Sequence, residues 1–117
     1  MDTNLIKKTM GFNHLIDINE GWVDRRVFCE QDIYEQELYR IFARSWLFVA
    51  HESQIPNPGD FFTSRMGAES VILTRDKKNN INAFLNTCRH RGLKVCRADR
   101  GNTSTFVCPY HGWTYGV

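Results

Sequence analysis

Two short strings, each holding one cysteine and one histidine, constrain how this chain of 117 residues can fold. The first is Cys88-Arg89-His90, and the second is Cys108-Pro109-Tyr110-His111, with seventeen residues between His90 and Cys108. A closed structural metal site takes four protein ligands, and each string offers only two. If the strings act together, the chain must therefore fold so that two separate loops face each other.

The ligand types in these strings point to a particular kind of metal centre. The pattern C-x-H-x17-C-x2-H contains two thiols and two imidazoles. In a Rieske [2Fe–2S] centre one iron takes two cysteine thiolates and the other takes two histidine imidazoles. We therefore expect Cys88 and Cys108 to bind a buried iron, and His90 and His111 to bind an outer iron. This ligand set predicts electron transfer.

A structural zinc site is the alternative, because two cysteines and two histidines also form tetrahedral zinc sites. Such sites usually place a cysteine pair first and a histidine pair after a spacer. Here each pair is mixed, and a single residue separates Cys88 from His90. The spacing favours the iron–sulfur centre, and a zinc-binding interaction module remains the second hypothesis.

The composition indicates a globular domain, with 42% hydrophobic and 24% charged residues. A net charge of +2 is too small to predict a nucleic-acid or membrane partner. No apolar run is long enough for a membrane span, and none follows Lys7 and Lys8 as a signal peptide would require. We therefore expect a cytoplasmic protein. Cys29 and Cys96 lie outside the two strings and are predicted to be small buried or half-buried thiols rather than disulfide partners.

The part of the chain before the strings predicts an arm and a helix. Residues 1–27 show no sustained periodicity and are expected to form an irregular arm. Asp32, with Glu35 three residues later, is typical of a helix start. Apolar residues follow at helical spacing, namely Ile33, Tyr34, Leu38, Ile41 and Phe42. We expect an amphipathic helix of about three turns.

The rest of the chain predicts strands, which makes the fold class mainly β (α+β). The segments with strand composition are 46–50, 61–63, 70–74, 81–87 and 104–107. A polar turn at 76–80 should join two of them into a hairpin. Both Cys/His strings then begin where a strand ends. Gly92, Gly112 and Gly116 would permit tight turns near them.

Other side chains near the strings have two interpretations each. Tyr110 and Trp113 could shield a cluster or be ordinary core aromatics. Basic residues give the first loop a positive face, and they are Arg89, Arg91, Lys94, Arg97 and Arg100. This face could dock an acidic electron donor, or it could be a solvated loop that happens to be basic.

The run NTCRHRGLKVCRADRGNTSTFVCPYHGWTYG (86–116) resembles the Rieske domain of the large (α) subunit of bacterial aromatic-ring-hydroxylating dioxygenases. It is nearest to the biphenyl/benzene and naphthalene groups of that family. The stretches DIYEQELYRIFARSWLFVAHESQIPNPGDF (32–61), MGAESVILTRD and INAFLN also resemble it. The resemblance implies a Rieske-type antiparallel β fold, with an arm at 1–27 and a partial Rieske domain with its leading helix at 28–117.

The resemblance also implies a place in a larger oxidoreductase. A reductase, often through a ferredoxin, would pass NAD(P)H electrons to the Rieske cluster. The cluster would pass them to a mononuclear non-haem Fe(II), where dioxygen and an aromatic ring give a cis-dihydrodiol. Neighbouring α subunits and a small β subunit would form α3 or α3β3 assemblies. The 2-His-1-carboxylate motif for the second iron is missing from this sequence, so we expect a C-terminally incomplete chain that is not catalytically competent alone.

Two other kinds of Rieske protein fit less well. Rieske proteins of respiratory complexes carry a disulfide between the two cluster loops, and Leu93 and Tyr110 occupy those places here. A cluster without that bridge is expected to have a lower reduction potential. A stand-alone Rieske ferredoxin, which carries electrons and is not an enzyme, stays open as the alternative. The oxygenase subunit is favoured because a helix-bearing leader precedes the strings.

Overall fold

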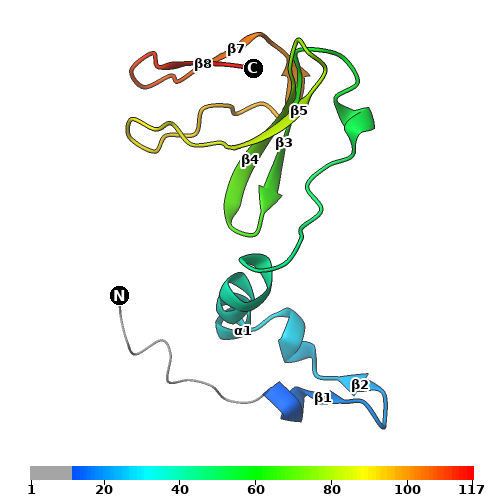
Figure 1. Cartoon of the computed structure of the whole chain (residues 1–117). Helices are drawn as coiled ribbons and strands as arrows, with labels where there is room; N and C mark the ends of the chain where they lie inside the picture. Colours follow the sequence, from blue (N-terminus) through cyan, green and yellow to red (C-terminus); the bar gives the residue numbers. More distant parts are fainter. Residues whose placement is uncertain (1–11) are drawn as a thin grey trace. The chain divides into compact units, whose positions relative to one another are not determined.

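The computed structural model describes residues 12–117, which divide into two compact units (Figure 1). The first unit ends at Ile41, and the second runs over Phe42–Val117. The predicted boundary after residue 27 falls inside the first unit. Both Cys/His strings belong to the second unit, so the candidate site depends on that unit's fold.

The described part of the first unit contains a short hairpin and one α-helix. Its elements in chain order are a 3₁₀ helix at Phe12–Leu15, β1 at Ile16–Asp17, β2 at Trp22–Val23, a 3₁₀ helix at Arg25–Phe28 and α1 at Gln31–Glu37. β1 and β2 pair antiparallel. The prediction of an irregular arm over 1–27 is therefore wrong for the segment that forms this hairpin, and residues 1–11 lie outside the described part.

The predicted helix exists, but its start and its regularity differ from the prediction. α1 begins at Gln31 instead of after a capping Asp32, and Glu30 at the N-cap makes no side-chain capping bond. The Asp32 carboxylate accepts a hydrogen bond from the next backbone N–H, that of Ile33, at 3.1 Å. The helix continues as a wider, π-helical turn over Leu38–Phe42. No helix within residues 12–117 is long and apolar enough to cross a membrane.

The second unit is built from antiparallel strands, which confirms the mainly β fold class. The strands are β3 (Asp60–Met66), β4 (Glu69–Arg75), β5 (Ile81–Leu85), β6 (Arg100–Asn102), β7 (Thr105–Val107) and β8 (Thr114–Gly116). Four of them form one sheet in the order β5-β4-β3-β6, and β7 and β8 form a separate pair. The predicted hairpin across residues 76–80 is the β4–β5 connection.

β4 is the centre of the core because both of its faces are buried. Val71 and Leu73 point to one face, where they pack with Ile55. Ile72 points to the other face, where it packs with Phe61 and with Cys96. A strand buried on both sides carries consecutive apolar residues, which explains the uninterrupted run in the sequence. Partly buried side chains extend the two clusters, namely Val49, Ala50 and Phe62 on one side and Phe106 on the other.

The predicted strand at 46–50 is wrong. The segment has no regular structure and pairs with no strand in the described chain. Trp46 and Phe48 are exposed, at 103% and 82%, while Val49 and Ala50 pack on the core. The packing of Val49 and Ala50 on the core, and not strand pairing, therefore holds this segment against the second unit. A buried arginine also anchors the residues that follow, because Arg75 Nε donates to the Ile55 carbonyl at 2.6 Å.

The two cysteines outside the strings have different environments. Cys96 is buried at 6% exposure in the core, as predicted, whereas Cys29 is exposed, so the prediction of a buried or half-buried thiol is wrong there. All four cysteines are free thiols in this structure. His51 caps a 3₁₀ helix at Glu52–Gln54 through its ring Nδ1, as a structural histidine would.

Gly101 on β6 should not tolerate a side chain. A Cβ there would lie 2.8 Å from Phe61 Cε1 and 2.9 Å from Phe61 Cζ. Phe61 cannot easily move, because it is buried and its ring packs edge-on against Phe106 with centroids 5.2 Å apart. We predict that Gly101→Ala lowers the free energy of unfolding by about 1–3 kcal/mol, as overpacking does. Urea titration followed by circular dichroism measures the loss.

The matched control is Gly116→Ala on β8. No atom lies within 4 Å of a Cβ at this position, so the substitution meets open space. We expect a change of about 0.5 kcal/mol or less. Equal destabilisation by the two substitutions would contradict the proposed clash with Phe61.

Candidate metal centre

Two neighbouring loops carry the Cys/His strings. The first loop leaves β5 after Leu85, and the second joins β7 to β8. Figure 1 draws both loops projecting toward the same side of the second unit. A side-chain contact between Cys88 and Tyr115, described below, confirms that they lie side by side. The fold thus brings together two segments that the sequence separates by seventeen residues.

Both loops use the same backbone turn to present their cysteine. In the first loop Gly92 N donates to Cys88 O at 2.8 Å, and Cys88 N donates to the carbonyl of the residue after Gly92 at 2.8 Å. In the second loop Gly112 N donates to Cys108 O at 3.0 Å, and Cys108 N donates to the carbonyl after Gly112 at 2.8 Å. The two glycines have φ values of 73° and 74°, a region that favours glycine. The predicted tight turns are therefore present at both glycines.

The candidate ligands are arranged as two pairs. Cys88 and Cys108 are buried, at 3% and 2% exposure. His90 and His111 are exposed, and the centroids of their rings lie 4.8 Å apart. No group of three or more His, Cys, Asp or Glu side chains in residues 12–117 is placed to hold one metal ion. The thiols thus occupy the inner side of the site and the imidazoles the outer side.

Two aromatic side chains lie against the imidazoles. The Trp113 ring stacks on His90 at a centroid distance of 5.1 Å, with only 3° between the ring planes. Tyr110 lies against His111 at 3.9 Å with a tilt of 36°. Trp113 and Tyr110 remain 49% and 56% exposed, so neither is a core aromatic. They cover faces of the imidazoles, on the outer side of the site.

Tyr115 links the two loops through its hydroxyl. Its Oη lies 3.1 Å from Cys88 Sγ and accepts a hydrogen bond from Arg89 N at 3.1 Å. Either atom can donate while Cys88 is a thiol, but a Cys88 thiolate carries no hydrogen, so Tyr115 is then the donor to Cys88 Sγ. A residue of β8 thus holds the first ligand loop.

The same contact changes the acidity of Cys88. The hydrogen bond from Tyr115 is the largest cause that lowers the pKa of this thiol, and burial opposes it. Backbone N–H groups of His90 and Arg91 and the Cys108 side chain lower the pKa further. The hydrogen bond to Cys88 also raises the pKa of Tyr115. Thiolates are the form that binds iron, so these donors favour the ligating state of Cys88.

Asn86 fixes the base of the first loop, two residues before Cys88. It is buried at 2% exposure and uses both ends of its amide. Oδ1 accepts from Val95 N at 3.1 Å and from Cys96 N at 2.8 Å. Nδ2 donates to Cys96 O at 2.7 Å and to Ser70 Oγ at 3.3 Å. Asn86 therefore closes the loop by tying its beginning to its end.

Sequence reasoning selected the four candidate ligands but missed these two supporting residues. The structure brings all four candidates to one end of the second unit, while their metal ligation stays a prediction. Tyr115 could have been suspected from strand alternation, because it is half-buried between exposed neighbours on β8. Asn86 had no comparable signal, since a single polar residue after a strand is common at turns.

The residues present fit the group that the sequence predicts. Two thiols lie together on the inner side with N–H and O–H donors directed at one of them. Two imidazoles lie together on the outer side, where solvent or a partner can reach their rings. A [2Fe–2S] centre of mixed ligation needs such a separation, because each of its irons takes one kind of ligand.

Curated proteins similar to this chain include alpha subunits of biphenyl and benzene dioxygenases. The biphenyl 2,3-dioxygenase subunit alpha of Rhodococcus jostii (strain RHA1) is 52% identical over 101 residues, which cover 86% of this chain and 22% of that protein. The benzene 1,2-dioxygenase subunit alpha of Pseudomonas putida is 48% identical and covers 92% of this chain and 24% of that protein. The chain thus spans less than a quarter of the length of these relatives.

Solved structures and a family model agree with this likeness. Naphthalene 1,2-dioxygenase from Rhodococcus sp. bound to indole has a TM-score of 0.75 and 46% identity, covering 80% of this chain and 21% of that chain. A quaternary ammonium Rieske monooxygenase has a TM-score of 0.71 and 33% identity, covering 80% of this chain and 27% of that chain. Residues 45–117 match the family model described as "Rieske [2Fe-2S] domain". This match extends over more than half of the sequence and includes both Cys/His strings, so the chain belongs to the Rieske [2Fe–2S] domain family.

Proposed function

We propose that this chain is the Rieske [2Fe–2S] electron-transfer part of the α subunit of an aromatic-ring-hydroxylating dioxygenase. The observation that carries the proposal is the pairing of two buried thiols with two exposed imidazoles on matched loops. The likeness to α subunits named for biphenyl and benzene supports the aromatic substrate class. Another relative is named as an N,N-dimethyl phenylurea N-demethylase, so the proposal names a substrate class and no single substrate.

Each residue of the site has a role in this proposal. Cys88 and Cys108 would hold the inner iron, and His90 and His111 would hold the outer iron. When bound, the cluster takes up and releases one electron at a time. Tyr115 and the backbone N–H groups of the first loop stabilise the Cys88 thiolate. The exposed imidazole rings give a redox partner the shortest approach to the centre.

The wider reaction follows from the family as a proposal. Electrons from NAD(P)H would arrive through a reductase or a ferredoxin in the cytoplasm. They would continue to a mononuclear non-haem iron in a part of the subunit outside these 117 residues, where an aromatic ring is cis-dihydroxylated. Neighbouring α subunits and a small β subunit, in an α3 or α3β3 assembly, would complete the enzyme.

A stand-alone Rieske ferredoxin is less well supported. The similar curated proteins are named as α subunits of dioxygenases. Their likeness covers 86% to 92% of this chain, which is more than the Rieske match over residues 45–117. Similarity to these subunits is therefore not limited to the cluster-binding segment that a small carrier would share.

Metal analysis tests the cluster directly. The anaerobically purified chain should contain iron and acid-labile sulfide in equal amounts, about two of each per chain. Zinc with no sulfide would instead support the interaction module, because a structural zinc site needs no sulfide. Elemental analysis combined with a colorimetric sulfide assay measures both quantities on one sample.

Substitution of one ligand against one non-ligand cysteine tests the assignment of residues. His111→Cys exchanges a neutral imidazole for a thiolate, so we expect an altered or lost Rieske electron paramagnetic resonance signal. Cys96→Ser is the control, since this thiol lies in the core with Phe61 and Ile72. It should keep the signal. Loss of the signal in Cys96→Ser, with the fold intact by circular dichroism, would show that the ligand assignment is wrong.

Removing the Tyr115 hydroxyl should lower the reduction potential. The hydroxyl donates to Cys88 Sγ, and hydrogen bonds to cluster sulfurs favour the more negative, reduced state. Tyr115→Phe should therefore shift the midpoint potential downward, on the order of tens of millivolts, while the cluster remains bound. A spectroscopic redox titration measures the shift. Tyr110→Phe is the matched control, because its ring lies against His111 and, within residues 12–117, the Tyr115 hydroxyl is the one that contacts a cysteine sulfur. Its potential should stay unchanged.

A further inference from the structure

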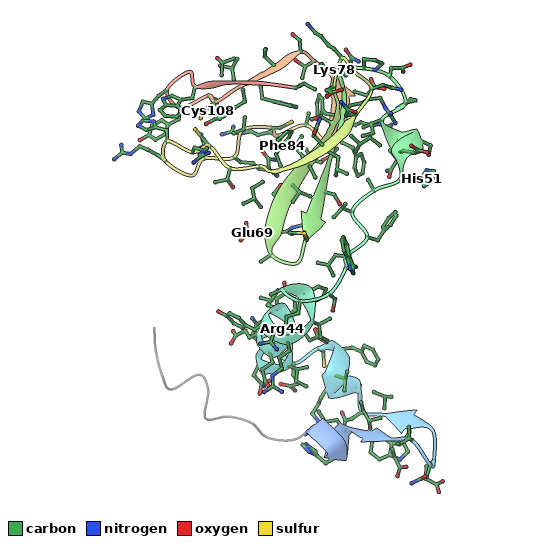
Figure 2. The ribbon with its side chains drawn as sticks, viewed as in Figure 1. Arg44, His51, Glu69, Lys78, Phe84 and Cys108 are labelled. Atoms are coloured by element: carbon green, nitrogen blue, oxygen red, sulfur yellow. The ribbon has the colours of Figure 1, made fainter. Side chains whose placement is uncertain are left out.

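The two ligand loops are closed in different ways. The second loop joins β7 to β8, and three residue pairs between these strands hold its ends together. The first loop runs from β5 to β6, which lie at opposite edges of the sheet in the order β5-β4-β3-β6. Figure 2 labels Phe84 on the strand that leads into the first loop and Cys108 on the second loop. Because β5 and β6 do not pair, another contact must return the first loop toward its beginning.

Asn86 supplies this contact with its side chain instead of a strand. Its backbone N–H donates to Ser70 O at 2.8 Å, which extends the ladder between β4 and β5 by one residue. Its amide then meets the far end of the loop as a neighbouring strand would. Oδ1 accepts from Val95 N and Cys96 N, and Nδ2 donates to Cys96 O at 2.7 Å. The closure encloses the eight residues 87–94, which include Cys88 and His90.

The far end of this closure is fixed to the core. Cys96 is buried, and its side chain packs with Phe61 and Ile72. Asn86 is buried as well, so water does not compete for its amide, and its hydrogen bonds are strong for that reason. Loss of the amide would take a partner from buried backbone groups of Cys96, which is costly. The closure is therefore stable before any metal binds.

We propose that Asn86 is a positioning residue for the cluster, because it holds the first loop closed around Cys88 and His90. The inference rests on the proposed function, since it concerns how firmly a [2Fe–2S] cluster is retained. Within residues 12–117 the side-chain hydrogen bonds of Asn86 go to other residues than the candidate ligands, so it acts through the loop backbone. Without the amide, the first loop should open locally and release iron while the sheet stays folded.

The chain offers a matched control that separates positioning from general stability. Asn86→Leu keeps a side chain of similar size and removes both polar groups of the amide. Leu73→Ala removes buried apolar atoms and so weakens the fold. Leu73 packs with Ile55 and Val71, on the face of β4 opposite to the one that packs with Cys96. Only the first substitution therefore breaks the closure of the ligand loop.

The experiment follows cluster loss from the full chain, loaded with its cluster, after addition of excess EDTA. Visible absorbance of the cluster gives the rate. We expect Asn86→Leu to lose its cluster about tenfold faster than the unsubstituted chain, or more, because buried hydrogen-bonding groups are left unpaired. Leu73→Ala should stay within about twofold, because local opening of the loop does not require the sheet to unfold.

Hydrogen exchange measured by mass spectrometry locates the opening in the same samples. Backbone amides of residues 87–95 should exchange faster in Asn86→Leu than in the unsubstituted chain. Amides of residues 108–113 should exchange at an unchanged rate, because the pairing of β7 with β8 closes the second loop independently of Asn86. The second loop thus serves as a control within each molecule.

Several results would overturn the role of Asn86. Equal cluster loss in Asn86→Leu and Leu73→Ala would mean that retention follows overall stability, and equal exchange in the two loops would mean that no local opening occurs. If circular dichroism shows that Asn86→Leu does not fold, Asn86→Asp replaces it, because it keeps the oxygen that accepts from Val95 N and Cys96 N. This variant should lose its cluster about threefold faster or more, and a rate equal to that of the unsubstituted chain contradicts the proposal. An unsubstituted chain that holds no cluster overturns the proposed function as well, whereas a normal cluster with any of the other results overturns the role of Asn86 alone.

Discussion

The hydroxyl of Tyr115 connects the two loops on which the whole candidate site depends. It hydrogen-bonds to Cys88 Sγ and accepts from Arg89 N, so one side chain of β8 fixes both the sulfur and the backbone of the other loop. Neither loop could assemble the site alone, since each supplies one thiol and one imidazole. The contact also acts on chemistry, because a donor at the sulfur stabilises the thiolate that iron requires. The hydrogen bond between Tyr115 and Cys88 thus both positions the first loop and stabilises the thiolate.

The sheet supplies the rigid base from which these loops project. β4 is buried on both faces and fixes β5 beside it, which sets the point where the first loop begins. Asn86 then returns the loop to the core by bonding both backbone groups of Cys96, whose thiol packs with Phe61 and Ile72. The hydrogen bonds of Asn86 therefore close the first loop, and the packing of Cys96 in the core holds its end in place. Cys96 is important for this packing although it is not a candidate ligand.

Local patterns in the sequence predicted the parts of the fold that local physics controls. The apolar run of β4, the polar turn before β5 and the glycines of the ligand loops were all recognisable, because burial, turn formation and positive φ each demand particular residues. The segment 46–50 was mistaken for a strand because its composition suits one, but a strand also needs a neighbour, and the sequence does not reveal pairing. Tyr115 and Asn86 were missed for the same reason, since their partners are 27 and 10 residues away in the chain.

The candidate site has a buried side, which holds the thiols, and an exposed side, which holds the imidazoles. The thiols are buried at 2–3% exposure among hydrogen-bond donors, while the imidazoles are exposed and lie against half-exposed aromatic rings. Within residues 12–117 the chain itself covers the thiol side, whereas the imidazole rings are exposed. The first loop contains Arg89, Arg91 and Lys94, and the second loop contains no charged residue. The exposed candidate ligands and the half-exposed aromatic rings thus lie together on the same side of the site.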